Sequence, residues 1–147
     1  MEWVTGMEMR ALVEAFYSRI WNAGDLSVLP ALLREDFTFR GSLGAERKGH
    51  EGFRAYVAMV RGALREYRCE VLDLVVEDRR AFARVRFSGV HEGEFLGFAP
   101  SGERVEWLGA AMFTSADDGR IADIWVLGDV PTLLEQLARN ARPRSDR

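Results

Sequence analysis

The sequence predicts an α+β fold in which three N-terminal helices pack on a strongly curved, mostly antiparallel sheet, followed by a short C-terminal helix. Two observations indicate this class. Apolar residues recur at helical spacing in the first half, whereas from Cys69 onward their period falls from about 3.6 to about 2 residues. Helices followed by a run of strands are typical of α+β domains. The length, 147 residues, favours one domain with a sizeable core.

Three helices are expected before the strands. The first covers residues 7–21 and ends at Gly24 in a left-handed conformation. The second is short, about residues 27–34, with Ser27 as its N-cap. The third covers about residues 51–65. The first helix has an apolar face of Met9, Leu12, Val13, Phe16, Ile20 and Trp21, and the third has one of Phe53, Tyr56, Val57, Val60 and Leu64.

Alternating apolar and polar residues predict the sheet. Long strands are expected at residues 69–78, 80–91, 103–116 and 120–127, with a shorter piece within residues 35–40. A final helix at residues 131–139 would be capped by Asp129. Where helices and a curved sheet do not fully meet, a cone-shaped cavity remains, and such cavities are the default ligand sites.

Composition excludes several functional classes. The net charge is −3, which gives no indication of a nucleic-acid partner, and no apolar stretch approaches the roughly 18 residues of a membrane span. No signal peptide is recognisable, and Cys69 is the only cysteine, so no internal disulfide can form. We therefore expect a cytoplasmic protein with Cys69 buried on a strand. The basic tail, about residues 140–147, is expected to be disordered.

Three stretches carry a family resemblance: "GHEGFRAYVAMVRGAL", "HEGEFLGFAPSGERVEWLG" and "DGRIADIWVLGD". They resemble the SnoaL-like polyketide cyclases of the NTF2-like superfamily, and the similarity extends over roughly residues 12–137. The resemblance implies a pocket for a small, largely apolar and often aromatic ligand. It also implies cofactor-free acid–base chemistry, an intramolecular aldol closure, without a metal ion.

The resemblance also shows which groups this chain lacks. The founding cyclases use an aspartate on the last strand, and the corresponding position in this chain is Val126. The position of their helper histidine corresponds to the segment 110–113, which is apolar in this chain. In the related ketosteroid isomerases the base falls on Gly41, whereas the tyrosine that donates to the oxyanion matches Tyr17. One donor is therefore retained, and the base of both relatives is missing.

Candidate catalytic residues each have a simpler structural alternative. Tyr17 is either a pocket donor or a core tyrosine, and His91 either takes part in catalysis or fixes a hairpin turn. Asp36 is either a base at the cavity mouth or a solvated helix end. Asp123 and Asp129 fit rim and capping positions better than an active site. Expected ligand-binding residues are Trp21, Phe39, Tyr56, Phe95, Phe98, Trp107, Trp125 and Val126, whose aromatic rings offer stacking surfaces.

Three hypotheses follow from these features. The chain is a cyclase or isomerase acting on a small carbonyl compound, or it binds such a ligand without turnover, or it works as a protein–protein module. Apolar residues on both faces of segments 81–90 and 121–127 indicate that the outer sheet face is covered. We therefore expect a homodimer that pairs through this face.

Overall fold

The N-terminal helix changes geometry halfway along. In the computed structural model, which describes residues 6–141, α1 (Gly6–Ala15) continues directly into a π-helical segment, η1 (Phe16–Asn22). Gly24 follows with a φ of 71° and ends the segment as expected. The extent of the predicted helix is confirmed, but its second half is wound more widely than an α-helix. Such π-segments are frequent at functional sites.

The second helix is shorter than expected. A single 3₁₀ turn, η2 (Leu26–Val28), leads into α2 (Leu29–Leu32). The predicted N-cap, Ser27, is wrong, because the Asp25 carboxylate accepts the hydrogen bond from the Ser27 amide. The helix ends early because Leu33 already belongs to a strand.

The third helix, α3 (Gly49–Ala63), confirms the expected apolar face, with Phe53, Tyr56, Val57 and Val60 all buried. Leu64 is buried as well, but it opens a strand instead of closing the helix. Its backbone pairs with His91, and this tertiary pairing ends the helix two residues earlier than expected.

Six strands form one mixed sheet. They are β1 (Leu33–Arg40), β2 (Arg47–Lys48), β3 (Leu64–Glu77), β4 (Arg80–His91), β5 (Arg104–Ser115) and β6 (Ile121–Gly128). Their order across the sheet is β2-β1-β6-β5-β4-β3. All four predicted long strands are confirmed. The sheet is antiparallel except for the β1–β6 pair, which is parallel.

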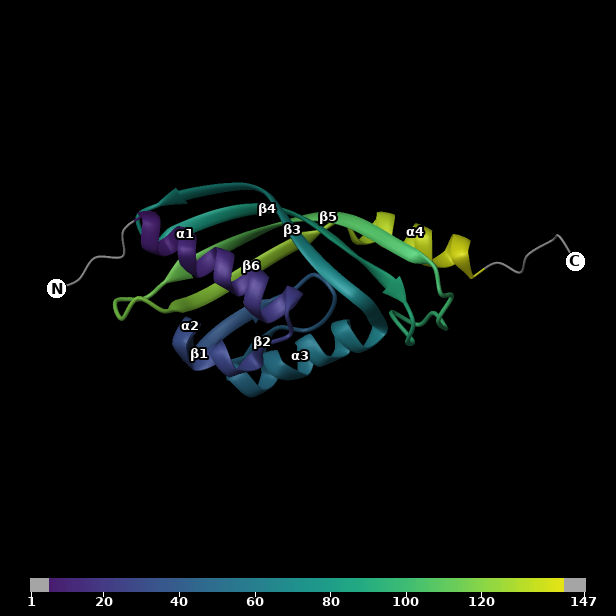
Figure 1. The fold of residues 1–147 in the computed structure, drawn as a ribbon, viewed down its shortest axis with the longest axis horizontal. Helices are drawn as coiled ribbons and strands as arrows, with labels where there is room; N and C mark the ends of the chain where they lie inside the picture. Colours follow the sequence, from purple (N-terminus) through teal and green to yellow (C-terminus); the bar gives the residue numbers. More distant parts are fainter. Residues whose placement is uncertain (1–5, 142–147) are drawn as a thin grey trace, which may run out of the picture.

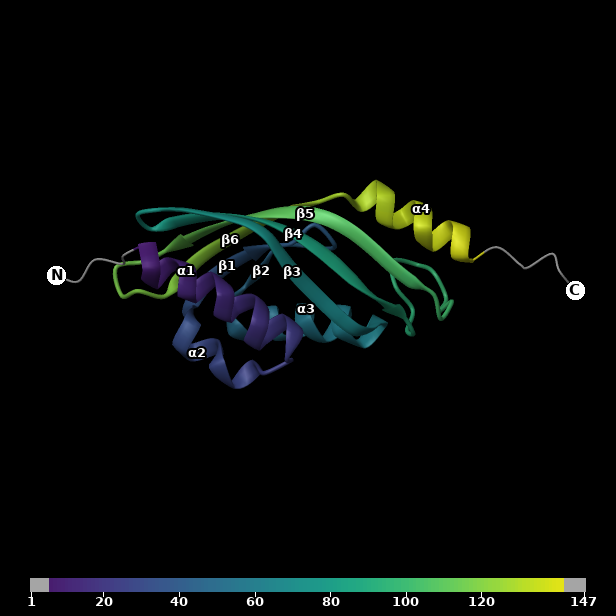
Figure 2. The same cartoon turned by 45° about the horizontal axis from the view of Figure 1, so that its top comes forward.

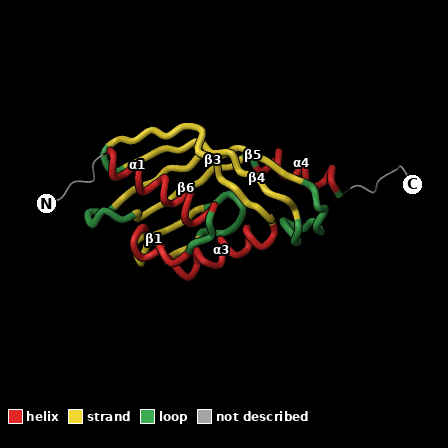
Figure 3. Tube along the Cα trace, viewed as in Figure 1, coloured by secondary structure: helices red, strands yellow, loops and turns green. Residues whose placement is uncertain are grey.

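The helices divide unequally between the two faces of the sheet. Figures 1 and 2 show α1, α2 and α3 together on one face, which we call the inner face. The last helix, α4 (Val130–Asn140), lies beyond the end of β6 and packs on β5. The tube in Figure 3 shows β3, β4 and β5 running the length of the molecule over the helical layer. A ligand site enclosed by both layers therefore lies on the inner face.

Strand alternation separates the two faces chemically. Along β4, Ala83, Val85 and Phe87 are buried on the inner face, whereas Arg84 and Arg86 point outward. These arginines pair with acidic residues across the outer face, as Arg84 does with Asp73 of β3. Both arginines are therefore ion-paired on the outer face and do not line a site on the inner face.

Several large apolar side chains remain exposed on the outer face. They are Val75, Phe82, Leu108, Trp125 and Leu127. Across the described part of the chain, no helix is long and apolar enough to cross a membrane. The basic tail named above falls mostly outside the described residues, which end at 141.

Adjacent leucines test how α4 is docked. Leu133 is fully buried, whereas Leu134 is 39% exposed on the same helix. Leu133→Ala should lower the free energy of unfolding by about 2–5 kcal/mol, because it leaves a cavity between α4 and the sheet. Leu134→Ala is the matched control and should cost about 0.5 kcal/mol or less. Urea denaturation of both variants measures the difference, and equal costs would show that α4 is not anchored by Leu133.

Candidate functional site

An aromatic cavity lies between the helical layer and the inner face of the sheet. Eight of its eleven lining residues are aromatic. The lining consists of Phe16, Tyr17, Trp21, Phe39, Ser42, Leu43, Tyr56, Tyr67, Phe87, Trp107 and Val126. They come from η1, α3, the β1–β2 loop and five strands, so no single sequence segment contains the site.

The π-helical segment is fixed to the sheet by one amide side chain. Asn22 donates from Nδ2 to the Cys69 carbonyl at 3.0 Å and accepts from the Cys69 amide at 2.7 Å. Both hydrogen bonds go to the backbone of β3, which sets the distance between η1 and the sheet. Tyr17 and Trp21 on η1 are thereby held against the strand residues that complete the cavity.

A bulge in β3 turns a third tyrosine into the cavity. The pairing of β3 with β4 shifts register between Arg65 and Arg68, and Glu66 has a φ of 55°. An extra residue in one strand reverses the alternation beyond it. Tyr67 is therefore buried on the inner face, beside Trp21 at a ring distance of 5.4 Å.

Two glycines leave room for the rings. A Cβ atom on Gly109 would lie 2.6 Å from the Phe87 ring, and one on Gly41 would lie 2.5 Å from the Tyr56 hydroxyl. Both contacts are too short for any side chain. The glycines therefore let Phe87 and Tyr56 pack directly on the backbone.

The mouth of the cavity lies between the β1–β2 loop and β6. Ser42, Leu43 and Val126 are half-buried, whereas the other lining residues are buried. The enclosed space is about 30 Å³. A cavity that holds benzene measures about 150 Å³. A ring-sized ligand must therefore extend through the mouth or displace lining side chains.

All three tyrosines of the chain line this cavity. Burial raises the pKa of Tyr56 to about 12 and holds the pKa of Tyr17 and Tyr67 well above the usual value of 10. The Tyr56 oxygen is hydrogen-bonded to the Leu43 backbone, and the Arg47 guanidinium lies 5.7 Å from the centre of its ring. All three phenols are therefore neutral hydrogen-bonding groups near neutral pH.

Cys69 adjoins the tyrosines without being reactive. Its thiol is buried as predicted, and burial raises its pKa to about 12, so it is not a thiolate near neutral pH. The Tyr67 hydroxyl is hydrogen-bonded to its sulfur. This occupies Tyr67 and leaves Tyr17 and Tyr56 as the phenols better placed for a ligand.

No carboxylate or imidazole is among the described residues that line the cavity. Val126, the position that the resemblance assigned to the catalytic aspartate, does line it. In the described part of the chain, no group of three His, Cys, Asp or Glu side chains is placed to hold a metal ion. The site can donate hydrogen bonds and stack rings, but none of its side chains is a strong base near neutral pH.

The structure brings together six of the residues predicted for the site. They are Tyr17, Trp21, Phe39, Tyr56, Trp107 and Val126. Their presence in one cavity is what the ligand-binding prediction requires, and their role in binding stays a prediction.

His91, predicted as catalytic, lies outside this cavity with two of the predicted ligand-binding residues. Its ring is buried at the end of β4, 6.4 Å from the ring of Phe95, and its Nδ1 is 3.4 Å from the Ser101 hydroxyl. Phe95 in turn pairs with Phe98 through the backbone. This cluster closes the loop between β4 and β5, which agrees with the turn-fixing alternative for His91.

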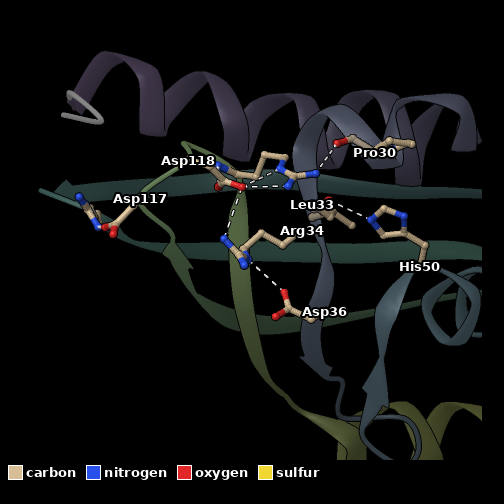
Figure 4. A network of polar contacts seen from close by, with 9 residues as sticks. Pro30, Leu33, Arg34, Asp36, His50, Asp117 and Asp118 are labelled. Carbon is tan, nitrogen blue, oxygen red and sulfur yellow. Dashed lines mark hydrogen bonds and ion pairs between the residues drawn. The ribbon is translucent and has the colours of Figure 1, made fainter. Parts of the chain in front are cut away.

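Asp36 lies on an exposed stretch of β1. Figure 4 shows its carboxylate paired with Arg34, at 3.0 Å, and Arg34 also reaches Asp118. The hydrogen bond from Arg34 lowers the pKa of Asp36, which makes it a weaker base. His50 in the same view is hydrogen-bonded to the Leu33 carbonyl, a structural position at the start of α3. The geometry does not place Asp36 at the cavity.

Trp125 requires a correction. Adjacent strand residues point to opposite faces, so Trp125 and Val126 cannot both line the cavity. Val126 lines it, and Trp125 is 43% exposed on the outer face. Asp123 shares this outer face and is hydrogen-bonded to Thr38, and Asp129 accepts from the Thr132 amide as the cap of α4. Both aspartates thus have the structural roles expected of them.

Five lining residues were not predicted, namely Phe16, Ser42, Leu43, Tyr67 and Phe87. The sequence signal for Phe87 was its place in the alternation Ala83, Val85, Phe87, and in the structure it pairs directly with Trp107 across β4 and β5. Inward-facing aromatics on paired strands share one face, so a cavity role for Trp107 implies one for Phe87. No sequence signal identifies the loop residues Ser42 and Leu43.

Comparison with known proteins identifies the family. The model of the SnoaL-like polyketide cyclases matches residues 11–137, and the chain belongs to this family. TsrD from Streptomyces laurentii is 31% identical, with a TM-score of 0.79 over 90% of this chain and 96% of that one. IdmH from Streptomyces antibioticus is 25% identical, with a TM-score of 0.77 over 88% of this chain and 98% of that one.

A third structure supports the fold alone. A SnoaL-like protein from Jannaschia sp. CCS1 is 22% identical and superposes with a TM-score of 0.84 over 94% of this chain and 95% of that one. The architecture is thus an NTF2-like α+β fold. No functionally curated protein matches the chain.

The burial of every tyrosine predicts an unusual alkaline titration. Free tyrosines ionise near pH 10, whereas the folded protein should show almost no tyrosinate absorbance at about pH 11. Because the folded-state pKa values are raised, their contribution to stability is complete below about pH 10 and is lost as the pH rises further. Tyrosinate absorbance and far-ultraviolet circular dichroism should therefore change together. A phenol that titrates near pH 10 in the folded protein would contradict the burial.

Proposed function

We propose that this protein binds a small, largely apolar carbonyl compound of the polyketide type and promotes its ring closure without a cofactor. Membership of the SnoaL-like polyketide cyclase family supports the reaction class. The single observation that supports this ligand is the cavity itself, with its eight aromatic residues and its neutral donors. Aromatic walls favour flat apolar molecules, and phenolic donors favour a carbonyl oxygen.

Ring closure needs orientation and stabilisation of the developing oxyanion. In an intramolecular aldol step, an enol carbon forms a bond to a carbonyl carbon, the enol proton passes to water, and the carbonyl oxygen gains negative charge before it is protonated. Holding the two carbons together removes much of the entropic barrier. Tyr17 and Tyr56 are the phenols proposed to donate to the charged oxygen.

The missing base is compatible with this chemistry. A methylene group between two carbonyls is acidic enough to enolise without a dedicated carboxylate, and the mouth at Ser42 and Val126 admits water. The proposal therefore assigns no proton-transfer step to Asp36 or His91. The cavity contributes shape and hydrogen bonds, and the substrate contributes its own acidity.

A second candidate is binding of the same class of ligand without turnover. It is favoured by Val126, which stands in the cavity at the place of the family's aspartate. The two candidates share the ligand and differ only in whether the rate of ring closure rises.

A linear aryl triketone, with alternating carbonyl and methylene groups, distinguishes them. The protein should accelerate its cyclisation above the rate in buffer, measured by chromatography of the ring-closed product. Tyr17→Phe should lower the accelerated rate about 10- to 100-fold, because an oxyanion donor is lost. Tyr67→Phe is the matched control and should have a smaller effect, since that hydroxyl is already bonded to Cys69.

The outcomes separate the two candidates. Saturable binding with no acceleration would establish the binding role and contradict the cyclase. If the triketone neither binds nor reacts, both candidates fail.

We also propose that the outer sheet face pairs with a second copy of the chain. Val75, Phe82, Met112 and Trp125 stand side by side on four neighbouring strands in direct register. Val75, Phe82 and Trp125 are exposed to 62%, 40% and 43%. A contiguous apolar row of this kind on a sheet face indicates a contact surface.

Charge introduced into this row should produce monomers. Phe82→Glu would bury a carboxylate at the proposed interface, so sedimentation velocity should show the mass of one chain instead of two. Met59→Glu is the control, because Met59 is exposed on α3 in the opposite layer. A wild-type protein that sediments as a monomer at micromolar concentration would overturn the dimer.

A further inference from the structure

The indole of Trp107 has a buried donor that no described residue satisfies. Trp107 is 2% exposed, and within residues 6–141 its Nε1–H has no hydrogen-bond partner. A buried tryptophan N–H usually finds a partner, and leaving one unpaired costs about 1–3 kcal/mol. Trp107 lines the cavity, so the unsatisfied donor belongs to the ligand site.

We propose that Trp107 Nε1–H and the Ser42 hydroxyl form a two-donor subsite for a carbonyl or enolate oxygen of the ligand. This subsite rests on the proposed function, since it assigns one oxygen of the same ligand to named donors. It differs from the phenol donors because it lies at the β6 side of the cavity, next to the mouth.

Gly128 shows that the two donors lie near the same point of β6. A Cβ atom built on Gly128 would lie 3.5 Å from Trp107 Nε1 and 2.6 Å from Ser42 Oγ. Gly128 is two residues beyond Val126 on β6, so the Cα–Cβ direction at Gly128 points to the same face as the Val126 side chain, which lines the cavity. Because Gly128 carries no side chain, Ser42 packs directly on its backbone beside the indole, and a ligand oxygen reaches both donors when the Ser42 side chain moves with the mouth.

The indole is held in place before any ligand arrives. Its ring lies 5.3 Å from the Phe87 ring and 6.3 Å from the Tyr67 ring. A donor fixed by its neighbours loses little entropy on binding. Ser42, on the half-buried β1–β2 loop, adds a hydroxyl that can rotate toward the same oxygen.

The chemistry of the lining selects a neutral or enolate oxygen. No lysine or arginine is among the described residues that line the cavity, and the Arg47 guanidinium lies over the Tyr56 ring outside this lining, so a carboxylate or phosphate beside Trp107 would have no counter-ion in the lining. A ketone oxygen needs only neutral donors. In the ring closure proposed above, Tyr17 and Tyr56 hold the oxygen that gains charge, so this pair would hold the enol oxygen or a second carbonyl oxygen of the same ligand.

Two probes of the same shape test the subsite. α-Tetralone carries a ketone oxygen on a fused ring system, and tetralin lacks the oxygen. The protein should bind α-tetralone about 3- to 10-fold more tightly than tetralin by calorimetric titration, as expected for one net hydrogen bond. The indole N–H resonance of Trp107 should move downfield with α-tetralone only.

Two substitutions isolate the donor. Trp107→benzothienylalanine replaces N–H by sulfur in a ring of nearly the same shape, and should abolish the preference while leaving tetralin affinity unchanged. Trp125→benzothienylalanine, on the outer face, is the matched control and should keep the preference. Gly128→Ala should weaken α-tetralone binding, since its methyl group would lie 2.6 Å from Ser42 Oγ and displace that hydroxyl from the indole.

The results distinguish this subsite from the proposed function. If both probes bind and the preference survives removal of the Trp107 N–H, the subsite is refuted while the ligand class stands. If both bind with equal affinity to the unmodified protein, the subsite is refuted in the same way. If neither binds, the proposed function fails, and the subsite fails with it.

Discussion

The site depends on the attachment of the π-helical segment to the third strand. Asn22 forms two hydrogen bonds with the backbone of Cys69, and these set the position of η1 over the sheet. Phe16, Tyr17 and Trp21 on η1 then meet the aromatic residues of the strands. Asn22 is half-buried and Cys69 is buried, and the single Asn22 side chain satisfies both the amide and the carbonyl of Cys69. The contact is rigid because breaking it would leave these polar groups unpaired.

This arrangement gives a cavity whose polar groups all donate. Phenols with raised pKa values, an unpaired indole N–H and a serine hydroxyl surround a space walled by rings. No carboxylate of residues 6–141 is in this lining, and Asp36, Asp123 and Asp129 serve an ion pair, a hydrogen bond and a helix cap, respectively. The separation fits a catalyst that orients and stabilises its substrate, with proton abstraction left to the acidity of the substrate and to water.

The sequence predicted the elements well and the site in part. Apolar periodicity identified α3, α4 and the four long strands, because these elements bury one continuous face. The bulge at Glu66 and the start of β3 at Leu64 could not be found, since both depend on pairing with β4. The same limit explains why Trp125 and Val126 were both assigned to the cavity. The face that each strand turns inward is set by register, and one residue of shift exchanges the two faces.

A ligand-bound crystal structure tests the central claim most directly. Crystals grown with α-tetralone should show its rings between the helical layer and the sheet, with the ketone oxygen within hydrogen-bonding distance of Trp107 Nε1. The mouth side chains, Ser42 and Leu43, should move to admit the rings, because the enclosed space of about 30 Å³ is too small for them. Density for the compound beside His91 and Phe95, or on the outer face, with the aromatic cavity unchanged, would contradict the account.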